Sequence, residues 1–117
     1  MQKRVPLLLF SLFVCFLVPE PAFTQQLTGT LIGTVKDEQG GVLPGATVTV
    51  SSPSLFGGAL TAATNEWGQL RFPVLPPGRY SLAVVLQGFA PYREDDIAIG
   101  AGSTIERSVV LALAGIA

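Results

Sequence analysis

The feature that most constrains the fold is an ordered series of strand and turn signals between Thr30 and Phe89. Three segments carry it: GTVKDEQGGVLPGATVTV, TNEWGQLRF and LPPGRYSLAVVLQGF. Each combines a short run of alternating apolar residues with a turn rich in Gly, Pro, Asn or Asp. Turn signals recur about every 8 to 12 residues and no amphipathic helical pattern competes with them, which is typical of a small β-sandwich.

The alternation of apolar and polar residues predicts an all-β domain with seven antiparallel strands in two packed sheets. The strands are expected at residues 30–36, 46–51, 60–64, 70–74, 79–87, 92–99 and 104–113. Val74 continues the alternation of Leu70 and Phe72, so it is expected on their face of the strand. The core is expected to contain Val48, Val50, Phe72, Leu82 and Val84.

The N-terminus has the pattern of a secretory signal peptide over residues 1–24. Lys3 and Arg4 precede the apolar run 5–18, and a polar, helix-breaking stretch follows to Thr24. At about 14 residues the apolar run is shorter than the roughly 20 that span a bilayer, which argues against a retained membrane anchor. We expect export and cleavage near Thr24 and Gln25, then a short linker (25–28), the domain (29–113) and a C-terminal tail (114–117), which could mark a truncation point.

Composition argues against nucleic acid as a partner. From Gln25 onward there are five basic and seven acidic residues, a net charge of about −2, with no basic stripe. A mature chain of roughly 90 residues can bury only one modest core. We therefore expect a single domain.

Two residue types that many catalytic sites and the usual zinc sites require are not available in the expected mature chain. There is no histidine, and the only cysteine, Cys15, lies in the predicted signal peptide. The usual nucleophile and base pairs and zinc sites therefore cannot be assembled, and we expect no enzyme activity and no cofactor. Lys36, which could in principle serve a Ser and Lys pair or an isopeptide bond to Asn65, is expected to be a solvated strand end.

Two exposed features remain as candidates for binding. Glu94, Asp95 and Asp96 form the densest carboxylate cluster, but neighbours on a strand point to opposite faces, so without a bulge we expect a solvated edge rather than a cation site. Phe56 and Trp67 lie in predicted loops, where aromatic side chains contact sugars or proteins. The favoured interpretation is that both fold back and cap the open ends of the sandwich. If the domain acts by binding, we expect both to be at least partly exposed at one end.

These residues resemble the carboxypeptidase regulatory-like domain, a transthyretin-like sandwich related to the collagen-adhesin B-type repeat. The resemblance covers residues 29–113 and implies a seven-stranded Greek-key, prealbumin-like fold. One departure is Leu70, where the family often has an aromatic residue. The residues that carry the resemblance are Gly33, Val35, Asp37, Gly40, Leu43–Ala46, Val48, Val50, Thr64–Gly68, Leu75–Leu82, Gly88 and Phe89.

The resemblance also implies a context. Such a domain directly after a signal peptide is similar to the N-terminal extension of TonB-dependent outer-membrane receptors, in which a plug and a barrel follow. We therefore expect a non-catalytic interaction module, periplasmic or associated with the outer membrane of a Gram-negative bacterium, whose partner is a protein or the rest of a receptor. The alternatives are a free-standing carbohydrate-binding-like module and, third, an accessory domain of an exported peptidase. Tyr80 is expected to form a corner-type hydrogen bond from its hydroxyl to nearby backbone.

Overall fold

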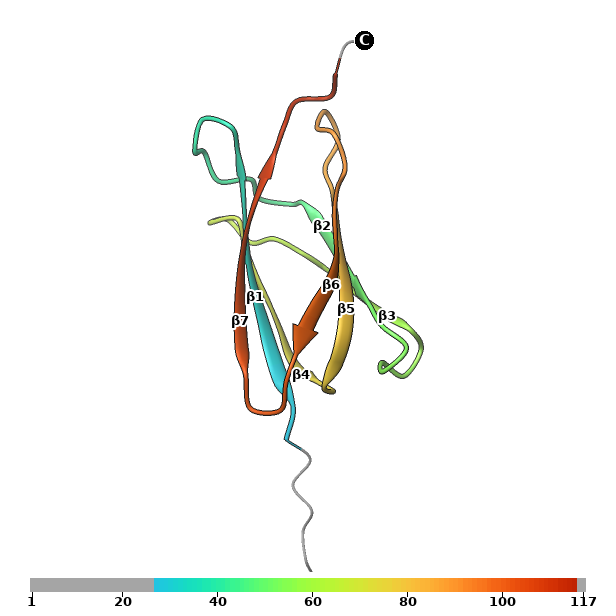
Figure 1. Cartoon of the computed structure of the whole chain (residues 1–117). Helices are drawn as coiled ribbons and strands as arrows, with labels where there is room; N and C mark the ends of the chain where they lie inside the picture. The colour runs from blue at the N-terminus through green and yellow to red at the C-terminus, as the bar shows by residue number, and fades with distance from the viewer. Residues whose placement is uncertain (1–26, 116–117) are drawn as a thin grey trace, which may run out of the picture.

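A computed structural model describes residues 27–115, so the predicted signal peptide and its cleavage site lie outside the described part of the chain. Figure 1 shows the arrangement of the strands. They are β1 (Gly29–Asp37), β2 (Thr47–Ser51), β3 (Ala59–Ala63), β4 (Gln69–Leu75), β5 (Gly78–Val85), β6 (Tyr92–Ile99) and β7 (Thr104–Leu111). Within residues 27–115 no helix of a length and apolarity suited to crossing a membrane is found.

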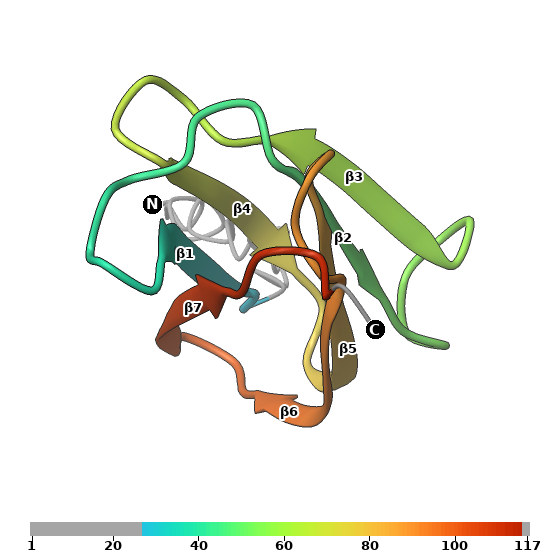
Figure 2. The same cartoon turned by 90° about the horizontal axis from the view of Figure 1, so that it is seen from above.

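The strands form two sheets that face each other (Figure 2). The three-stranded sheet has the order β4-β1-β7 and the four-stranded sheet the order β3-β2-β5-β6. All pairings are antiparallel except that of β1 with β7, which is parallel. The predicted seven-stranded β-sandwich is thus confirmed. The expectation of antiparallel strands throughout was wrong for β1 and β7, because β7 enters the three-stranded sheet from β6 of the other sheet and runs in the direction of β1.

Alternation along the strands produces one core between the sheets. Val48, Val50, Phe72, Leu82 and Val84 are each 5% exposed or less, which confirms all five predicted core residues. Polar or small neighbours such as Thr47, Thr49 and Ser51 occupy the opposite face of β2. Apolar burial at about 25 cal/mol per Å² makes this inter-sheet layer the main source of stability.

One residue of β4 departs from the prediction. Gly29 pairs with Leu75 but Leu31 pairs with Phe72, so Pro73 and Val74 together lie opposite Thr30 in a β-bulge. The extra residue turns Val74 outward, where it is 68% exposed with φ of 63°, and brings Leu75 into the core instead. The placement of Val74 on the face of Phe72 was wrong, because the side-chain alternation restarts after the bulge.

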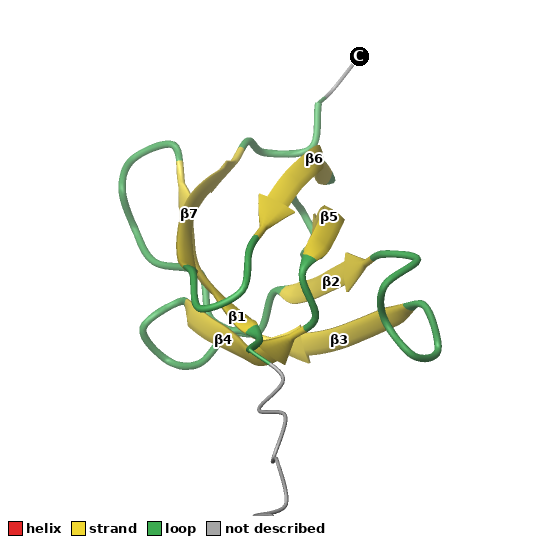
Figure 3. Ribbon diagram, turned by 60° about the horizontal axis from the view of Figure 1, so that its bottom comes forward, coloured by secondary structure: helices red, strands yellow, loops and turns green. Residues whose placement is uncertain are grey.

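The loops divide between two ends of the sandwich. In Figure 1 the lower end carries the connections at residues 52–58, 76–77 and 100–103, and the upper end those at 38–46, 64–68 and 86–91. Figure 3, with the lower end brought forward, shows the β2–β3 loop projecting from the side of the sandwich. Since β3 runs from one end to the other, the loops before and after it lie at opposite ends.

Candidate functional site

Trp67 is displayed on a rigid turn between β3 and β4. The side-chain oxygen of Asn65 accepts hydrogen bonds from the backbone N–H of Trp67 at 2.9 Å and of Gln69 at 3.0 Å. The Gly68 N–H donates to the Asn65 carbonyl at 2.9 Å and closes the turn. Such bonding by Asn explains why this residue suits a tight turn. The Trp67 side chain is 61% exposed, so its ring is available at the surface.

Gly68 connects the same turn to β1 through a backbone hydrogen bond and a close contact with Val35. Its φ is 72°, and a Cβ atom there would lie 2.7 Å from the Val35 carbonyl oxygen. Its own carbonyl accepts a hydrogen bond from the Val35 N–H at 2.8 Å. Only glycine combines this conformation with this close approach, so the position of Trp67 is fixed relative to the core.

Phe56 lies at the surface of the β2–β3 loop. The neighbouring Leu55 is buried against the core and anchors the loop, while Phe56 is fully exposed, at 103% of its reference area. Backbone hydrogen bonds from Leu55 to Ser52 and from Gly58 to Leu55, at 3.1 and 3.0 Å, hold the loop in compact turns. Phe56 was a candidate from the sequence, whereas the anchoring role of Leu55 was not predicted, because its only signal was its apolar character.

Both aromatic residues are exposed, as the binding interpretation requires, and the favoured interpretation that they cap the ends of the sandwich was wrong. They do not share one end, however. β3 has five residues, which at about 3.3 Å per residue separates the two loops by roughly 17 Å along the strand. The prediction of one binding end with both residues was therefore wrong, because consecutive loops on either side of one strand emerge at opposite ends.

The three carboxylates of β6 do not form a cation site. Tyr80 pairs with Ile97 and Leu82 with Glu94, so Asp95 and Asp96 together lie opposite Ser81 in a bulge. Each carboxylate pairs with a different arginine, as the O···N distances of 3.0, 3.0 and 3.9 Å for Glu94, Asp95 and Asp96 show. Among residues 27–115 no group of three ligand-type side chains that could hold a metal ion is found. Despite the bulge, the cluster forms a charged edge.

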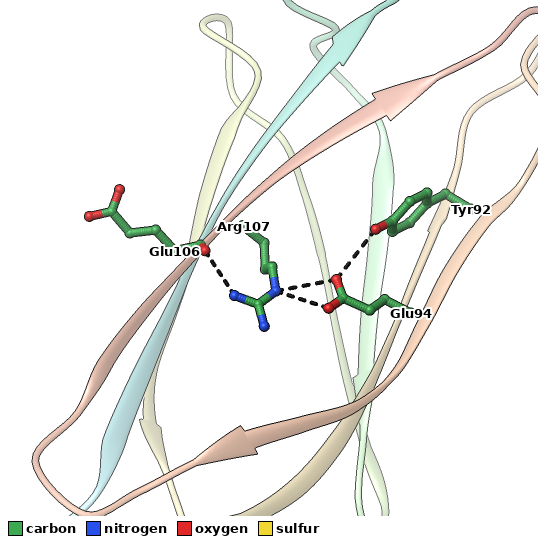
Figure 4. A network of polar contacts seen from close by, with 4 residues as sticks. All are labelled: Tyr92, Glu94, Glu106 and Arg107. Atoms are coloured by element: carbon green, nitrogen blue, oxygen red, sulfur yellow. Dashed lines mark hydrogen bonds and ion pairs between the residues drawn. The ribbon is translucent and has the colours of Figure 1, made fainter.

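One of these pairs joins the two sheets. Arg107 of β7 donates from Nε to both oxygens of Glu94 of β6, at 3.2 and 3.0 Å, and the Tyr92 hydroxyl donates to the same carboxylate at 3.3 Å (Figure 4). Burial, followed by the negative charge of Glu94, raises the pKa of Tyr92. The network closes the side of the sandwich on which β6 and β7 are neighbours.

Two further polar side chains are structural. The Tyr80 hydroxyl donates to the Pro76 carbonyl at 2.6 Å, which confirms the predicted corner bond, and burial raises the pKa of this phenol. Thr64, only 5% exposed, donates from its hydroxyl to the Leu43 carbonyl at 2.7 Å and accepts from the Ala46 N–H at 2.9 Å. Thr64 lies within a motif segment, but this bridging role could not be predicted from the sequence.

A shallow hollow lies near the C-terminal end of β7. Its volume is about 120 Å³, below the roughly 300 Å³ at which small-molecule sites begin. It is lined by Asp37, Glu38, Gln39, Phe89, Leu111 and Leu113. The hollow is therefore too small to be a candidate small-molecule site.

The sequence matches a family model over residues 30–112, which is most of the described structure. The chain belongs to the carboxypeptidase regulatory-like domain family. A curated relative is the TonB-dependent transporter Oar of Myxococcus xanthus, 40% identical over 92 residues. The match covers 77% of this chain but 8% of that protein, so the chain spans less than a tenth of its relative.

Solved structures share the fold of this regulatory-like domain. The 5-hydroxyisourate hydrolase of Klebsiella pneumoniae is 26% identical with a TM-score of 0.57, covering 74% of this chain and 92% of that one. A putative carbohydrate-binding protein from Bacteroides uniformis is 18% identical with a TM-score of 0.56, covering 72% and 41%. The TIE protein of Bacillus anthracis is 22% identical with a TM-score of 0.61, covering 74% and 16%. The last two likenesses concern the fold alone.

Proposed function

We propose that this chain is an exported, non-catalytic interaction module that forms the N-terminal extension of a TonB-dependent outer-membrane receptor. The observation that carries the proposal is the 40% identity to the transporter Oar, which extends over 92 residues and 77% of this chain. The basic and apolar start of the sequence supports export into the periplasm of a Gram-negative cell. The partner would be a protein or another part of the receptor.

The side chains support binding rather than catalysis. The sequence has no histidine, and each carboxylate of β6 lies within 4 Å of an arginine. A general base or nucleophile needs a positioned partner within hydrogen-bond reach, and arginine, which stays protonated in proteins, supplies neither. By contrast, Phe56 and Trp67 present large apolar surfaces to solvent on well-defined loops.

Cell fractionation tests the receptor proposal. The gene would be tagged at its chromosomal locus in the source organism, and the product followed through cytoplasmic, periplasmic and outer-membrane fractions. We expect the tag in the periplasmic or outer-membrane fraction, with an N-terminus near Gln25. A product that keeps Met1 and stays in the cytoplasm would overturn the proposal.

A second candidate function is carbohydrate binding, which the exposed Trp67 on its rigid turn favours because an indole face stacks on sugar rings. Calorimetric titration with a panel of oligosaccharides distinguishes the two. The receptor proposal predicts no saturable heat. Saturable binding that is lost in Trp67→Ala but kept in the matched Phe56→Ala would instead establish the carbohydrate-binding module.

A further inference from the structure

The four edge strands of the two sheets differ in their protection against strand pairing. β4 carries Arg71, Pro73 and the bulge at Val74, and β6 carries four charged residues and a bulge. β7 carries Glu106 and Arg107 and is linked to β6 by the pair of Arg107 with Glu94. Charges, proline and bulges are the features that discourage addition of a further strand. Three of the four edges are therefore protected.

β3 has none of these features. Its sequence, Ala-Leu-Thr-Ala-Ala, contains no charge and no proline, and its pairing with β2 is regular from Ala59 to Ala63. It ends its sheet, and four of its five residues are exposed. The surrounding residues 39–65 contain no Asp, Glu, Lys or Arg. The β2–β3 hairpin is thus an uncharged segment with an open backbone edge.

The hydrogen bonds at both ends of the hairpin show which backbone groups are open. Ser52 N–H donates to the Gly58 carbonyl at 3.0 Å, and Thr64 N–H to the Ala46 carbonyl at 2.9 Å. Hydrogen-bonded pairs alternate along an antiparallel ladder, so Leu60 and Ala62 also face β2. The N–H and C=O groups of Ala59, Thr61 and Ala63 therefore point to the free edge.

We propose that β3 pairs antiparallel with β3 of a second copy of this chain, with the two-fold axis at Thr61. In this register Thr61 faces Thr61, and each Ala59 faces the other copy's Ala63. Each of these pairs can exchange two backbone hydrogen bonds, since all the groups concerned point outward. The pairing joins two four-stranded sheets into one continuous sheet across an isologous interface.

The absence of charge on the β2–β3 hairpin and the positions of Phe56 and Trp67 favour a second copy of this chain as the partner of the β3 edge. A two-fold axis places identical residues near each other, so a charged edge would repel itself, whereas this hairpin carries no charge. Antiparallel pairing also brings the start of β3 beside the end of the other β3. The exposed Phe56, just before β3, is then carried toward the other copy's exposed Trp67, just after it. One interface thereby accounts for both residues although they lie at opposite ends of the sandwich.

Sedimentation velocity on the exported, purified protein tests the proposal, from about 1 µM to about 1 mM, the upper figure corresponding to association of about −4 kcal/mol. We expect a concentration-dependent monomer–dimer equilibrium. Thr61→Lys places two ammonium groups at the axis and should raise the dissociation constant at least tenfold. Thr61→Val keeps a β-branched, uncharged residue there and should retain the dimer, and Thr104→Lys on β7 is the control for added charge.

A second variant distinguishes loss of dimerisation from loss of folding. Ala63→Pro removes an N–H that points to the free edge and none that bonds β2, so far-UV circular dichroism should remain that of the wild type while dimerisation is lost. A protein that is monomeric up to about 1 mM would overturn the proposal. So would a dimer that persists in Thr61→Lys and Ala63→Pro, or a β3 edge that binds an extended segment of a different protein instead. The inference goes beyond the proposed receptor role, which would stand if it failed.

Discussion

At the scale of single residues, the side-chain hydrogen bonds differ in how well they can be predicted from the sequence. Tyr80 bonds the carbonyl of Pro76, four residues earlier, within a recognisable LPPGRY segment. Thr64 bonds Ala46 and Leu43, which are 18 and 21 residues away. The hydrogen bond of Tyr80 could be predicted because its two residues are close in the sequence. The hydrogen bonds of Thr64 could not, because they depend on the packing of the end of β3 against the segment before β2.

Thr64→Val tests this bridge. Valine has a similar shape but no hydroxyl, so the Ala46 N–H and the Leu43 carbonyl would lose their partner in a buried place. We expect the free energy of unfolding to fall by about 2 kcal/mol or more, since each buried unsatisfied group costs about 1 to 3 kcal/mol. Urea denaturation measures it. Thr64→Ser keeps the hydroxyl and should lose clearly less; equal losses in the two variants would show that packing, not hydrogen bonding, matters here.

At the scale of elements, the positions of the strands could be predicted from the sequence, but the β-bulges within them could not. All seven strands lie where alternation placed them, with ends that differ by up to two residues. The last strand ends at Leu111 rather than 113 because Ala112 and Ala114 bond Ala90 and Gly88 near the other sheet. The bulge in β4 was hidden because Leu70, Phe72 and Val74 read as perfect alternation. No feature of the neighbouring sequence indicated that Leu75, rather than Val74, would be buried in the core.

The bulge leads to a prediction for Val74. A β-branched residue at φ of 63° is strained, and the left-handed conformation costs roughly 1 to 2 kcal/mol. Asparagine tolerates this conformation, and the exposed Val74 side chain contributes little to the core. We expect Val74→Asn to raise the free energy of unfolding by about 1 kcal/mol in urea denaturation. A decrease would mean that the valine makes a contact worth more than the strain.

At the scale of the whole molecule, the two edges of the four-stranded sheet differ: β6 is charged, whereas β3 is uncharged and open. The ion pairs lie on β5, β6 and β7, whereas the β2–β3 hairpin has no charged residue. Phe56 and Trp67 could be named as candidate loop residues from the sequence, but their positions just before and just after the same edge strand, β3, could be known only from the topology. Sequence alternation specifies which face of a strand is buried and cannot show which strand ends its sheet.

Stability of the whole sandwich depends on the layer between the sheets, and Phe72 is its largest buried side chain on β4. Phe72→Ala should lower the free energy of unfolding by about 3 to 5 kcal/mol, through lost burial and a residual cavity. Thermal and urea denaturation monitored by circular dichroism would measure the change. A loss below about 1 kcal/mol would remove Phe72 from the core that joins the sheets.

The claim that the open β3 edge is the interaction surface is tested most directly by amide hydrogen exchange, followed by NMR at low and high protein concentration. Leu60 and Ala62, whose amides bond β2, should be protected at both concentrations and serve as internal controls. If β3 pairs with a second copy, the amides of Ala59, Thr61 and Ala63 should exchange quickly in the dilute protein and become protected in the concentrated one. Unchanged fast exchange of these three amides at both concentrations would contradict this pairing.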